Sequence, residues 1–310
     1  MNILVSGSIA YDSIMDFPDH FKNHILPDKI HNLNVSFLIG GMKLNFGGTA
    51  GNIAYNLKLL GETPVIVSTA GKDFEKYRQW MDGTGIDSSN IKIIEDEFTA
   101  LAHIITDKSD NQITAFYPGS MKYSGGEIKK EFLKNALAIV APGYKDDMIK
   151  YPKIYKENNI SYIYDPGQQI TSLEADELKN GIEGSLAFIS NDYELSLVMK
   201  KTGWSEKDIL ERAENLITTL GEKGSVIKTK KGKLEISPAK PENISDPTGA
   251  GDAYRAGFIK GLINKWPLGK CGKLASVVSA YTVETYGTQT HQFSWEDIKA
   301  RYKNNFSEEI

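Results

Sequence analysis

A glycine-rich turn near residue 250 constrains this chain more than any other stretch. Residues 246–258 read Asp-Pro-Thr-Gly-Ala-Gly-Asp-Ala-Tyr-Arg-Ala-Gly-Phe, so a carboxylate follows two glycines and precedes an expected helix. Such a turn can aim the backbone N–H groups of Gly249, Ala250 and Gly251 into one concavity, where they hold phosphate at a helix N-terminus. Asp252 would stand beside that concavity as a general base for an attacking hydroxyl. Taken alone, the same residues also fit a tight turn whose Asp caps the helix.

The composition is that of an ordinary globular protein. The chain has 310 residues, of which 40% are hydrophobic and 25% charged, and its formal net charge is −4. This charge gives no indication of nucleic-acid or membrane binding. The single cysteine, Cys271, excludes an internal disulfide and a multi-cysteine metal site. The sequence shows neither a basic leader nor an apolar run of 18 residues, so we expect a soluble cytoplasmic protein.

Short apolar runs alternate with helical patterns along the chain. The runs 3–7, 65–68, 137–140 and 186–189 end at or before turn residues, as buried parallel strands do. This alternation predicts one α/β domain over 1–310, with helices on both faces of a mostly parallel sheet. Ligands bind such sheets at the carboxyl ends of the strands. Helices are expected over 52–60, 74–81, 253–264 and 270–284, and a hairpin over 226–236.

Two stretches interrupt this alternation. Residues 14–44 show mild alternation at Val35, Phe37 and Ile39, and residues 98–116 read as two short strands around a polar turn. They predict extra antiparallel strands outside the main sheet, inserted as a lid over the ligand site. Exposed strands of this kind could also pair two subunits.

A second glycine cluster, at 46–52, also runs into an expected helix. Its paired glycines, including Gly48, let a ligand approach the backbone closely, and Asn52 could hydrogen-bond two vicinal sugar hydroxyls. Asp12, which follows the first strand, is another candidate for binding sugar hydroxyls. Alone, each side chain has an ordinary explanation, because Asn52 could cap the helix and Asp12 could lie in a surface loop.

Two further segments are candidates for holding a nucleotide and its metal ion. Thr219, Gly221 and Gly224 form a Thr-x-Gly-x-x-Gly turn, which can offer a hydroxyl and open N–H groups to a phosphate. Asn191 and Glu194 lie one helical turn apart, where they could hold Mg²⁺ through water or form a capping box. The sequence contains neither a P-loop signature nor a credible dinucleotide-binding fingerprint.

Together, these four motifs resemble the ribokinase-like (PfkB-type) carbohydrate kinase family. The resemblance spans nearly the whole chain, and the Asp-x-Thr-Gly-Ala-Gly-Asp block is its most specific part. Within the family, the chain is most similar to bacterial and archaeal nucleoside (adenosine) kinases, through the stretches 115–121 and 164–168 and through Arg255. The resemblance implies a three-layer αβα fold with a mostly parallel central sheet and a small β-strand lid.

The resemblance also implies a role for each candidate residue. Asp252 would be the base and Gly249, Ala250 and Gly251 the anion hole; Asp12, Gly48 and Asn52 would hold the ribose hydroxyls, with Phe116 against the nucleobase; Thr219, Gly221 and Gly224 would line the ATP site; and Asn191 and Glu194 would place Mg²⁺. A monovalent cation such as K⁺ stays open. Many members have Thr where Pro247 stands, and proline removes one N–H group from that turn.

The sequence therefore predicts ATP-dependent phosphorylation of the ribose 5′-hydroxyl of a purine nucleoside, above all adenosine, by a monomer or homodimer. A kinase of ribose or a ketohexose is the nearest alternative, although Phe37, Phe116 and Met121 are available to form an apolar slot beyond the ribose. A catalytically silent nucleoside-binding protein on the same scaffold is the second alternative, and the intact 249–252 segment argues against it.

Overall fold

The apolar runs of the sequence form one large sheet. We analysed a computed structural model that describes residues 1–109 and 111–310. Within these residues the sheet has nine strands, in the spatial order β13-β12-β11-β10-β9-β8-β1-β4-β5. The pairings from β11 to β5 are parallel, whereas β12 and β13 form an antiparallel hairpin at one edge. The strand bounds are β1 (Asn2–Ser6), β4 (Pro64–Gly71), β5 (Ile91–Ile94), β8 (Ala136–Val140), β9 (Ser161–Tyr164), β10 (Ala187–Asn191), β11 (Asn215–Thr219), β12 (Ser225–Thr229) and β13 (Gly232–Ile236).

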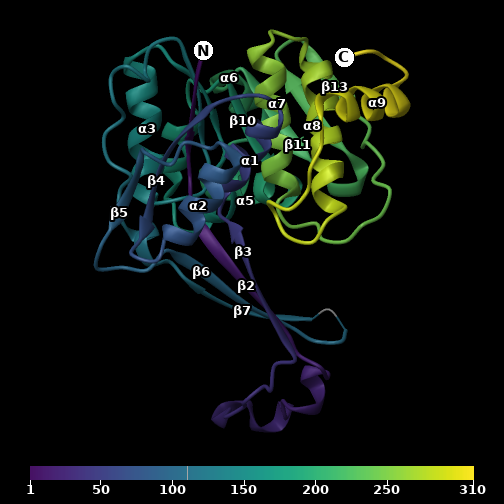
Figure 1. Cartoon of the computed structure of the whole chain (residues 1–310). Coiled ribbons are helices and arrows are strands. Elements are labelled where there is room, and N and C mark those ends of the chain that lie inside the picture. The colour runs from purple at the N-terminus through teal and green to yellow at the C-terminus, as the bar shows by residue number, and fades with distance from the viewer. Residues whose placement is uncertain (110) are drawn as a thin grey trace.

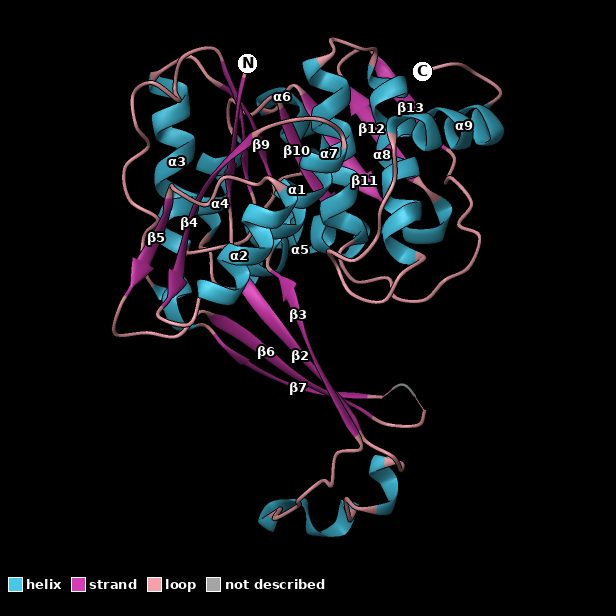
Figure 2. Ribbon diagram, viewed as in Figure 1, coloured by secondary structure: helices cyan, strands magenta, loops and turns pink. Residues whose placement is uncertain are grey.

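Helices cover both faces of this sheet, because its strands are apolar on both sides (Figure 2). In β1, Ile3 and Val5 pack in one core with α1, α2, α7 and α8, whereas Leu4 packs in a second core with α3 to α6. The helix bounds are α1 (Thr49–Leu59), α2 (Glu75–Thr84), α3 (Lys145–Glu157), α4 (Ala175–Ile182), α5 (Asp192–Thr202), α6 (Glu206–Arg212), α7 (Ala250–Ile263), α8 (Leu268–Val283) and α9 (Trp295–Phe306). The structure thus has the three layers that the sequence predicts.

A second, smaller sheet projects from this three-layer body (Figure 1). Its strands are β2 (Ala10–Asp16), β3 (Gly41–Gly47), β6 (Ala100–Thr106) and β7 (Gln112–Tyr117), in the order β3-β2-β6-β7. Residues 17–40 lie at its far end and contain the 3-10 helices η1 (Phe21–Asn23) and η2 (Pro27–Asn32). Three more 3-10 helices are η3 (Gly119–Lys122), η4 (Gly167–Thr171) and η5 (Gly221–Lys223).

The small sheet differs from the sequence prediction in three details. Strands occupy 10–16 and 41–47 rather than the interior of 14–44, and Val35, Phe37 and Ile39 lie outside any strand. The ring of Phe37 instead packs against Phe17, with centroids 4.8 Å apart, so this side chain belongs to an aromatic cluster rather than to one face of a sheet. The pairing of β2 with β6 is parallel, although the other two pairings are antiparallel as expected. Residue 110, within the stretch 98–116, lies outside the described residues.

The sequence prediction gives no bounds for α3, α4 or α6, and it omits the last helix, α9. Its N-terminus is a capping box in which the Ser294 side chain accepts from the Asp297 backbone N–H and the Asp297 carboxylate accepts from the Ser294 N–H. The Ser-x-x-Asp pattern in the sequence could have indicated the start of this helix. In the described part of the chain, no helix combines the length and apolar character needed to span a membrane.

Candidate active site

A cavity of about 650 Å³ lies where the carboxyl ends of β10 and β11 meet the small sheet and the N-termini of α1 and α7. It is lined by every site residue that the sequence predicts except Ala250 and Gly224. The two glycine clusters, about 200 residues apart in the chain, therefore lie on one cavity. This is the position at which parallel α/β sheets bind their ligands.

The turn at 249–251 forms the N-terminus of α7. Gly249 is the N-cap with φ of 81°, and a Cβ atom there would come within 2.9 Å of the Thr288 side chain. The first turn of a helix leaves backbone N–H groups without intrahelical partners, and the helix dipole adds positive potential. The Ala250 N–H donates to the Pro247 carbonyl at 3.3 Å. Gly249 and Gly251, which line the cavity, are therefore better placed than Ala250 to meet an anion.

The carboxylate of Asp252 connects the first turns of α7 and α1. Asn52 Nδ2 donates to Asp252 Oδ2 at 2.9 Å. Gly48 caps α1 with φ of 86°, and a Cβ there would lie 2.6 Å from the Ser8 carbonyl oxygen, so glycine allows the start of α1 to approach the segment between β1 and β2. The other end of the Asn52 amide, Oδ1, accepts from Gln289 Nε2 at 3.0 Å. One N–H of Asn52 stays available for a sugar hydroxyl, because an amide nitrogen carries two hydrogens.

Burial raises the pKa of two carboxyl groups that line the cavity. It raises the pKa of Asp252 to about 6, while the Arg255 guanidinium and the Asn52 hydrogen bond act in the opposite direction. Burial, together with the negative charge of Asp246, also raises the pKa of Asp12 to about 6. Asp12 lies on β2 and lines the same cavity. A carboxylate with this pKa is ionised at neutral pH yet able to accept a proton, as a general base must be.

A buried ion pair brings positive charge to the same cavity. The Arg255 Nε donates to Asp165 Oδ2, and the two residues are only 7% and 1% exposed. Asp165 Oδ1 has no hydrogen-bond partner within the described residues. The guanidinium lies against the turn, since a Cβ atom at Gly251 would approach its Nη1 to 2.7 Å. Arg255 therefore holds a fixed cation beside the N–H groups of the turn.

The residues predicted to bind the nucleotide and its metal ion lie at the ends of β10 and β11 and in the segments that follow these strands. Asn191 and Glu194 form a capping box, in which Asn191 Oδ1 accepts from the Glu194 N–H at 2.7 Å and Glu194 Oε2 accepts from the Asn191 N–H at 2.8 Å. Both also line the cavity, as do Thr219 and Gly221. Gly224 instead closes the η5 turn, where its carbonyl accepts from the Leu220 N–H at 2.8 Å.

A metal ion would find few protein ligands here. In residues 1–109 and 111–310, no group of three or more His, Cys, Asp or Glu is arranged to hold one. Only Oε2 of Glu194 is engaged by the cap, so the second oxygen of the carboxylate remains for a water-mediated contact. This donor set fits Mg²⁺ that arrives with a nucleotide, because Mg²⁺ keeps several waters and needs only one or two carboxylates.

The small sheet supplies the apolar lining. Phe116 on β7 lines the cavity although its side chain is 51% exposed, and Met121 from η3 lies on the same cavity. Phe37, the third apolar candidate, does not contribute, since it belongs to the aromatic cluster at the far end of the sheet. Gln168, at the start of η4, adds a polar group to the lining.

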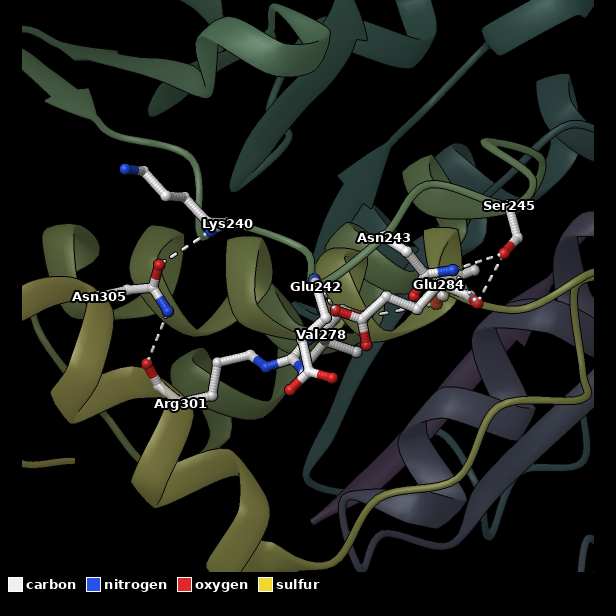
Figure 3. Close-up of polar contacts among 9 residues, drawn as sticks. Lys240, Glu242, Asn243, Ser245, Val278, Glu284, Arg301 and Asn305 are labelled. Carbon is white, nitrogen blue, oxygen red and sulfur yellow. Dashed lines mark hydrogen bonds and ion pairs between the residues drawn. The ribbon is translucent and has the colours of Figure 1, made fainter.

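The segment that leads into the glycine turn is tied to α8 and α9. The Glu284 carboxylate accepts from the Glu242 N–H at 2.6 Å and from Arg301 Nη1 at 2.8 Å. Ser245 Oγ donates to the Glu284 carbonyl at 2.9 Å, as Figure 3 shows. These contacts position the chain just before the 249–251 turn, so the turn starts from a fixed point.

Sequence reasoning gave no role to several polar residues of this region. Gln289 and His291 are only 2% and 1% exposed, yet they follow α8 in a Gly-Thr-Gln-Thr-His run that reads as a surface loop. Arg255 entered only as a mark of resemblance. A single sequence does not distinguish a buried polar side chain from an exposed one, so no feature of the sequence indicated that these residues are buried.

Comparisons with known proteins agree with this geometry. A family model described as pfkB family carbohydrate kinase matches residues 9–295. A nucleoside kinase of Methanocaldococcus jannaschii is 33% identical over 280 residues, which cover 90% of this chain and 92% of that protein. The structure of Burkholderia thailandensis nucleoside kinase in complex with inosine has a TM-score of 0.86 at 36% identity, covering 99% of both chains. The same kinase in complex with ADP-inosine has a TM-score of 0.84 at 37% identity, covering 99% of this chain and 97% of that one.

Proposed function

Because the chain belongs to the pfkB family of carbohydrate kinases, we propose that it is an ATP-dependent nucleoside kinase that phosphorylates the ribose 5′-hydroxyl of purine nucleosides, adenosine first among them. The observation that carries this proposal is the shared cavity, which is lined by Asp252, Gly249 and Gly251 together with the residues proposed for the sugar and for the nucleotide. The similarity to kinases described with inosine and with ADP-inosine supports a nucleoside as acceptor and ATP as donor.

The Asp252 carboxylate is the general base of this reaction. Its Oδ2 is occupied by the Asn52 N–H, so Oδ1 is the oxygen that receives the proton of the 5′-hydroxyl. As that proton leaves, the hydroxyl oxygen bonds to the γ-phosphorus and the bond from this phosphorus to the leaving ADP oxygen breaks. The N–H groups of Gly249 and Gly251 and the guanidinium of Arg255 stabilise the charge on the transferring group.

The sugar and the base occupy the side of the cavity that faces the small sheet. The Asp12 carboxylate accepts hydrogens from the ribose hydroxyls, and the free N–H of Asn52 donates to them. Gly48 lets the sugar approach the backbone closely. The ring of Phe116 packs on the nucleobase, which is what distinguishes a nucleoside from a plain sugar as substrate.

The nucleotide occupies the side formed by β10 and β11. Thr219 and Gly221 line the ATP site, and Gly224 shapes the turn that presents them. Asn191 and Glu194 would hold Mg²⁺ through water, and this ion would offset the phosphate charge when bound. We assign no residue to a monovalent cation.

The small sheet acts as a lid. When it closes over a bound nucleoside, it excludes water from the γ-phosphate and so limits hydrolysis of ATP. This role is supported by the position of Phe116, which belongs to the sheet and lines the cavity.

A substrate panel tests the proposal. Purified protein with ATP and Mg²⁺ is given adenosine, inosine, guanosine, cytidine, ribose or fructose, and ADP and 5′-monophosphate are measured. We expect the highest kcat/KM for purine nucleosides, with adenosine first. Faster turnover of ribose or fructose would instead identify a sugar kinase. Adenosine binding without ADP formation would identify a silent binding protein.

A further inference from the structure

Gln289 lies at the centre of a buried chain of hydrogen bonds that ends at Asp252. Trp80 Nε1 donates to Gln289 Oε1 at 3.1 Å, and Gln289 Nε2 donates to Asn52 Oδ1 at 3.0 Å. Asn52 Nδ2 then donates to Asp252 Oδ2 at 2.9 Å. These four residues come from α2, from the segment after α8, from α1 and from α7, so the chain connects four separate parts of the fold.

The direction of this chain is fixed at its Trp80 end. An indole nitrogen carries a hydrogen and has no acceptor lone pair, so it can only donate. Gln289 must therefore turn its oxygen toward Trp80 and its NH₂ group toward Asn52. Asn52 must in turn present its oxygen to Gln289, which leaves its own NH₂ group facing Asp252.

A second contact fixes the same direction independently. Gln289 Nε2 also lies 2.5 Å from the hydroxyl of Tyr77, and this hydroxyl donates to the Gly47 carbonyl at 2.9 Å. A carbonyl can only accept, so the single hydrogen of the Tyr77 hydroxyl is committed to Gly47. The hydroxyl must then accept from Gln289, which again requires the NH₂ group of Gln289 on this side. Gln289 is 2% exposed, so water does not compete for these contacts.

We propose that Gln289 is a positioning residue that keeps the Asn52 amide in the one orientation in which it donates to the Asp252 carboxylate. The proposal rests on the proposed function, in which Asp252 is the base. If Asn52 turned over, its oxygen would face a carboxylate oxygen, and only a protonated Asp252 could then hydrogen-bond to it. We call this chain of hydrogen bonds, from Trp80 through Gln289 and Asn52 to Asp252, the relay. It favours the ionised form of Asp252, which can accept a proton, and it directs Oδ1 toward the substrate.

Other charged or titratable groups also face Asp252 and influence its pKa. Arg255 lies on the same helix, Asp165 at the end of β9, Asp12 on β2 and the Tyr77 hydroxyl on α2. Glu194 on α5 lines the same cavity. The Asn52 hydrogen bond lowers the pKa of Asp252 against the larger upward effect of burial. Loss of this bond should therefore raise the pKa above about 6.

The test is the pH profile of kcat/KM for adenosine in the full-length enzyme. Gln289→Met keeps the length of the side chain and removes all its hydrogen bonds. We expect the acid limb of the profile to move up by about one pH unit. At pH 6, kcat/KM should fall about fivefold relative to the unchanged protein, whereas the two should be nearly equal at pH 8.5. An equal loss at every pH, with the limb in place, would overturn the proposal.

A second variant changes the direction of the chain rather than removing it. The carboxylate of Gln289→Glu can accept from Trp80 but cannot donate to Asn52. It should turn the Asn52 amide over and move the acid limb further than Gln289→Met does. A limb that stays at its original pH in both variants would contradict the proposed relay.

Milder variants address the case in which Gln289 substitutions fail to fold. Trp80→Phe and Tyr77→Phe each remove one of the two constraints on Gln289 and leave the other. We expect each alone to keep the limb near its original pH and the double variant to move it as Gln289→Met does. A double variant with an unmoved limb would count against the relay.

Three controls separate this proposal from the proposed function. Tyr55→Phe removes a hydroxyl that donates to the His291 carbonyl at 2.6 Å and accepts from Gln292 Nε2 at 2.7 Å, so it loosens the segment after α8 while every hydrogen bond of the relay remains, and its limb should not move. Asp12→Asn removes the other carboxyl group of the cavity whose pKa burial raises to about 6, so a limb that remains is not that of Asp12. Asp252→Asn should abolish the limb with most of the activity. If it does so while the Gln289 variants leave the limb unmoved, the relay alone is wrong; full turnover in Asp252→Asn would remove the base assignment itself.

Discussion

The two sides of the cavity are built differently. On the α1 and α7 side, Asn52 is 4% exposed, and its amide is hydrogen-bonded at both ends to fixed partners. On the side of the small sheet, every residue of β7 is exposed, and Phe116 lines the cavity with half of its side chain open to solvent. Chemistry that depends on the position of one proton needs buried, fully hydrogen-bonded supports. A surface that must open and close over a ligand needs few buried contacts.

Under the proposed function, Asp252 on the first side serves turnover, and Phe116 on the small sheet serves recognition of the nucleobase. Substitutions of Asp252 should therefore change kcat, and substitutions of Phe116 should change KM.

Asp252→Asn should lower kcat about 10²- to 10⁴-fold, the usual contribution of a general base. Binding of adenosine should persist, because the oxygen of the new amide can still accept from Asn52 Nδ2. Steady-state kinetics measures the first effect, and the rise of the melting temperature with adenosine measures the second. Tyr254→Phe is the matched control: it removes a buried hydroxyl of the same helix that pairs with Ser225, so its kcat should stay near that of the unchanged protein. Unchanged turnover in Asp252→Asn would contradict the proposed role of Asp252 in turnover.

Phe116→Ala tests the other side. We expect KM for adenosine to rise about tenfold while kcat changes less than about twofold, since stacking of a base on an aromatic ring contributes about 1–3 kcal/mol. The free energy of unfolding should change by no more than about 0.5 kcal/mol, because the side chain is largely exposed.

Ile113→Ala provides the matched control for this prediction. Ile113 is exposed on the same strand, but its position three residues from Phe116 places it on the opposite face, and it does not line the cavity. Its kinetic constants should not change. Equal losses in the two variants would show that the strand as a whole, rather than the ring of Phe116, holds the base.

The same contrast explains how far the sequence could predict the structure. The α1 and α7 turns are determined by local residues: Gly48 and Gly249 adopt positive φ angles that favour glycine, and their sequence context marks the start of a helix. The buried strands β1, β4, β8 and β10 were predictable for the same reason, since their apolar runs and terminal turn residues are local signals, whereas the buried strand β11 was not predicted. The family motifs then located most of the residues that line the cavity.

The contacts that the sequence did not reveal join residues that lie far apart in the chain. Gln289 is separated from Trp80 by 209 residues and from Asn52 by 237, and no local pattern links them. The pairing of Arg255 with Asp165 is hidden in the same way. In the segment next to the small sheet, the local pattern was misleading: the alternation at 35–39 suggested a strand, but these residues form none, and Phe37 packs in an aromatic cluster.

The raised pKa of Asp252 also affects the free energy of unfolding of the protein. Burial raises the pKa of Asp252 from 3.8 to about 6, so the folded protein holds this proton at pH values where the unfolded chain has lost it. Because the folded state then binds more protons than the unfolded state, the free energy of unfolding falls as the pH rises from about 4 to about 6. Above that window, the ionised carboxylate destabilises the unliganded protein.

Asp252→Asn removes this penalty while retaining an acceptor for Asn52. We expect the variant to be more stable than the unchanged protein by about 1–2 kcal/mol at pH 8, since one pKa unit corresponds to about 1.4 kcal/mol and solvent in the cavity screens part of the shift. The gain should disappear near pH 4, where both proteins carry a neutral group at this position. Urea unfolding at pH 4, 6 and 8 measures the difference, with Asp82→Asn on the exposed surface of α2 as the control. A gain that is independent of pH would show that the side chain is held by packing alone; the expected pattern would show that this side of the cavity keeps its charge at a cost in stability, as a site built for proton transfer does.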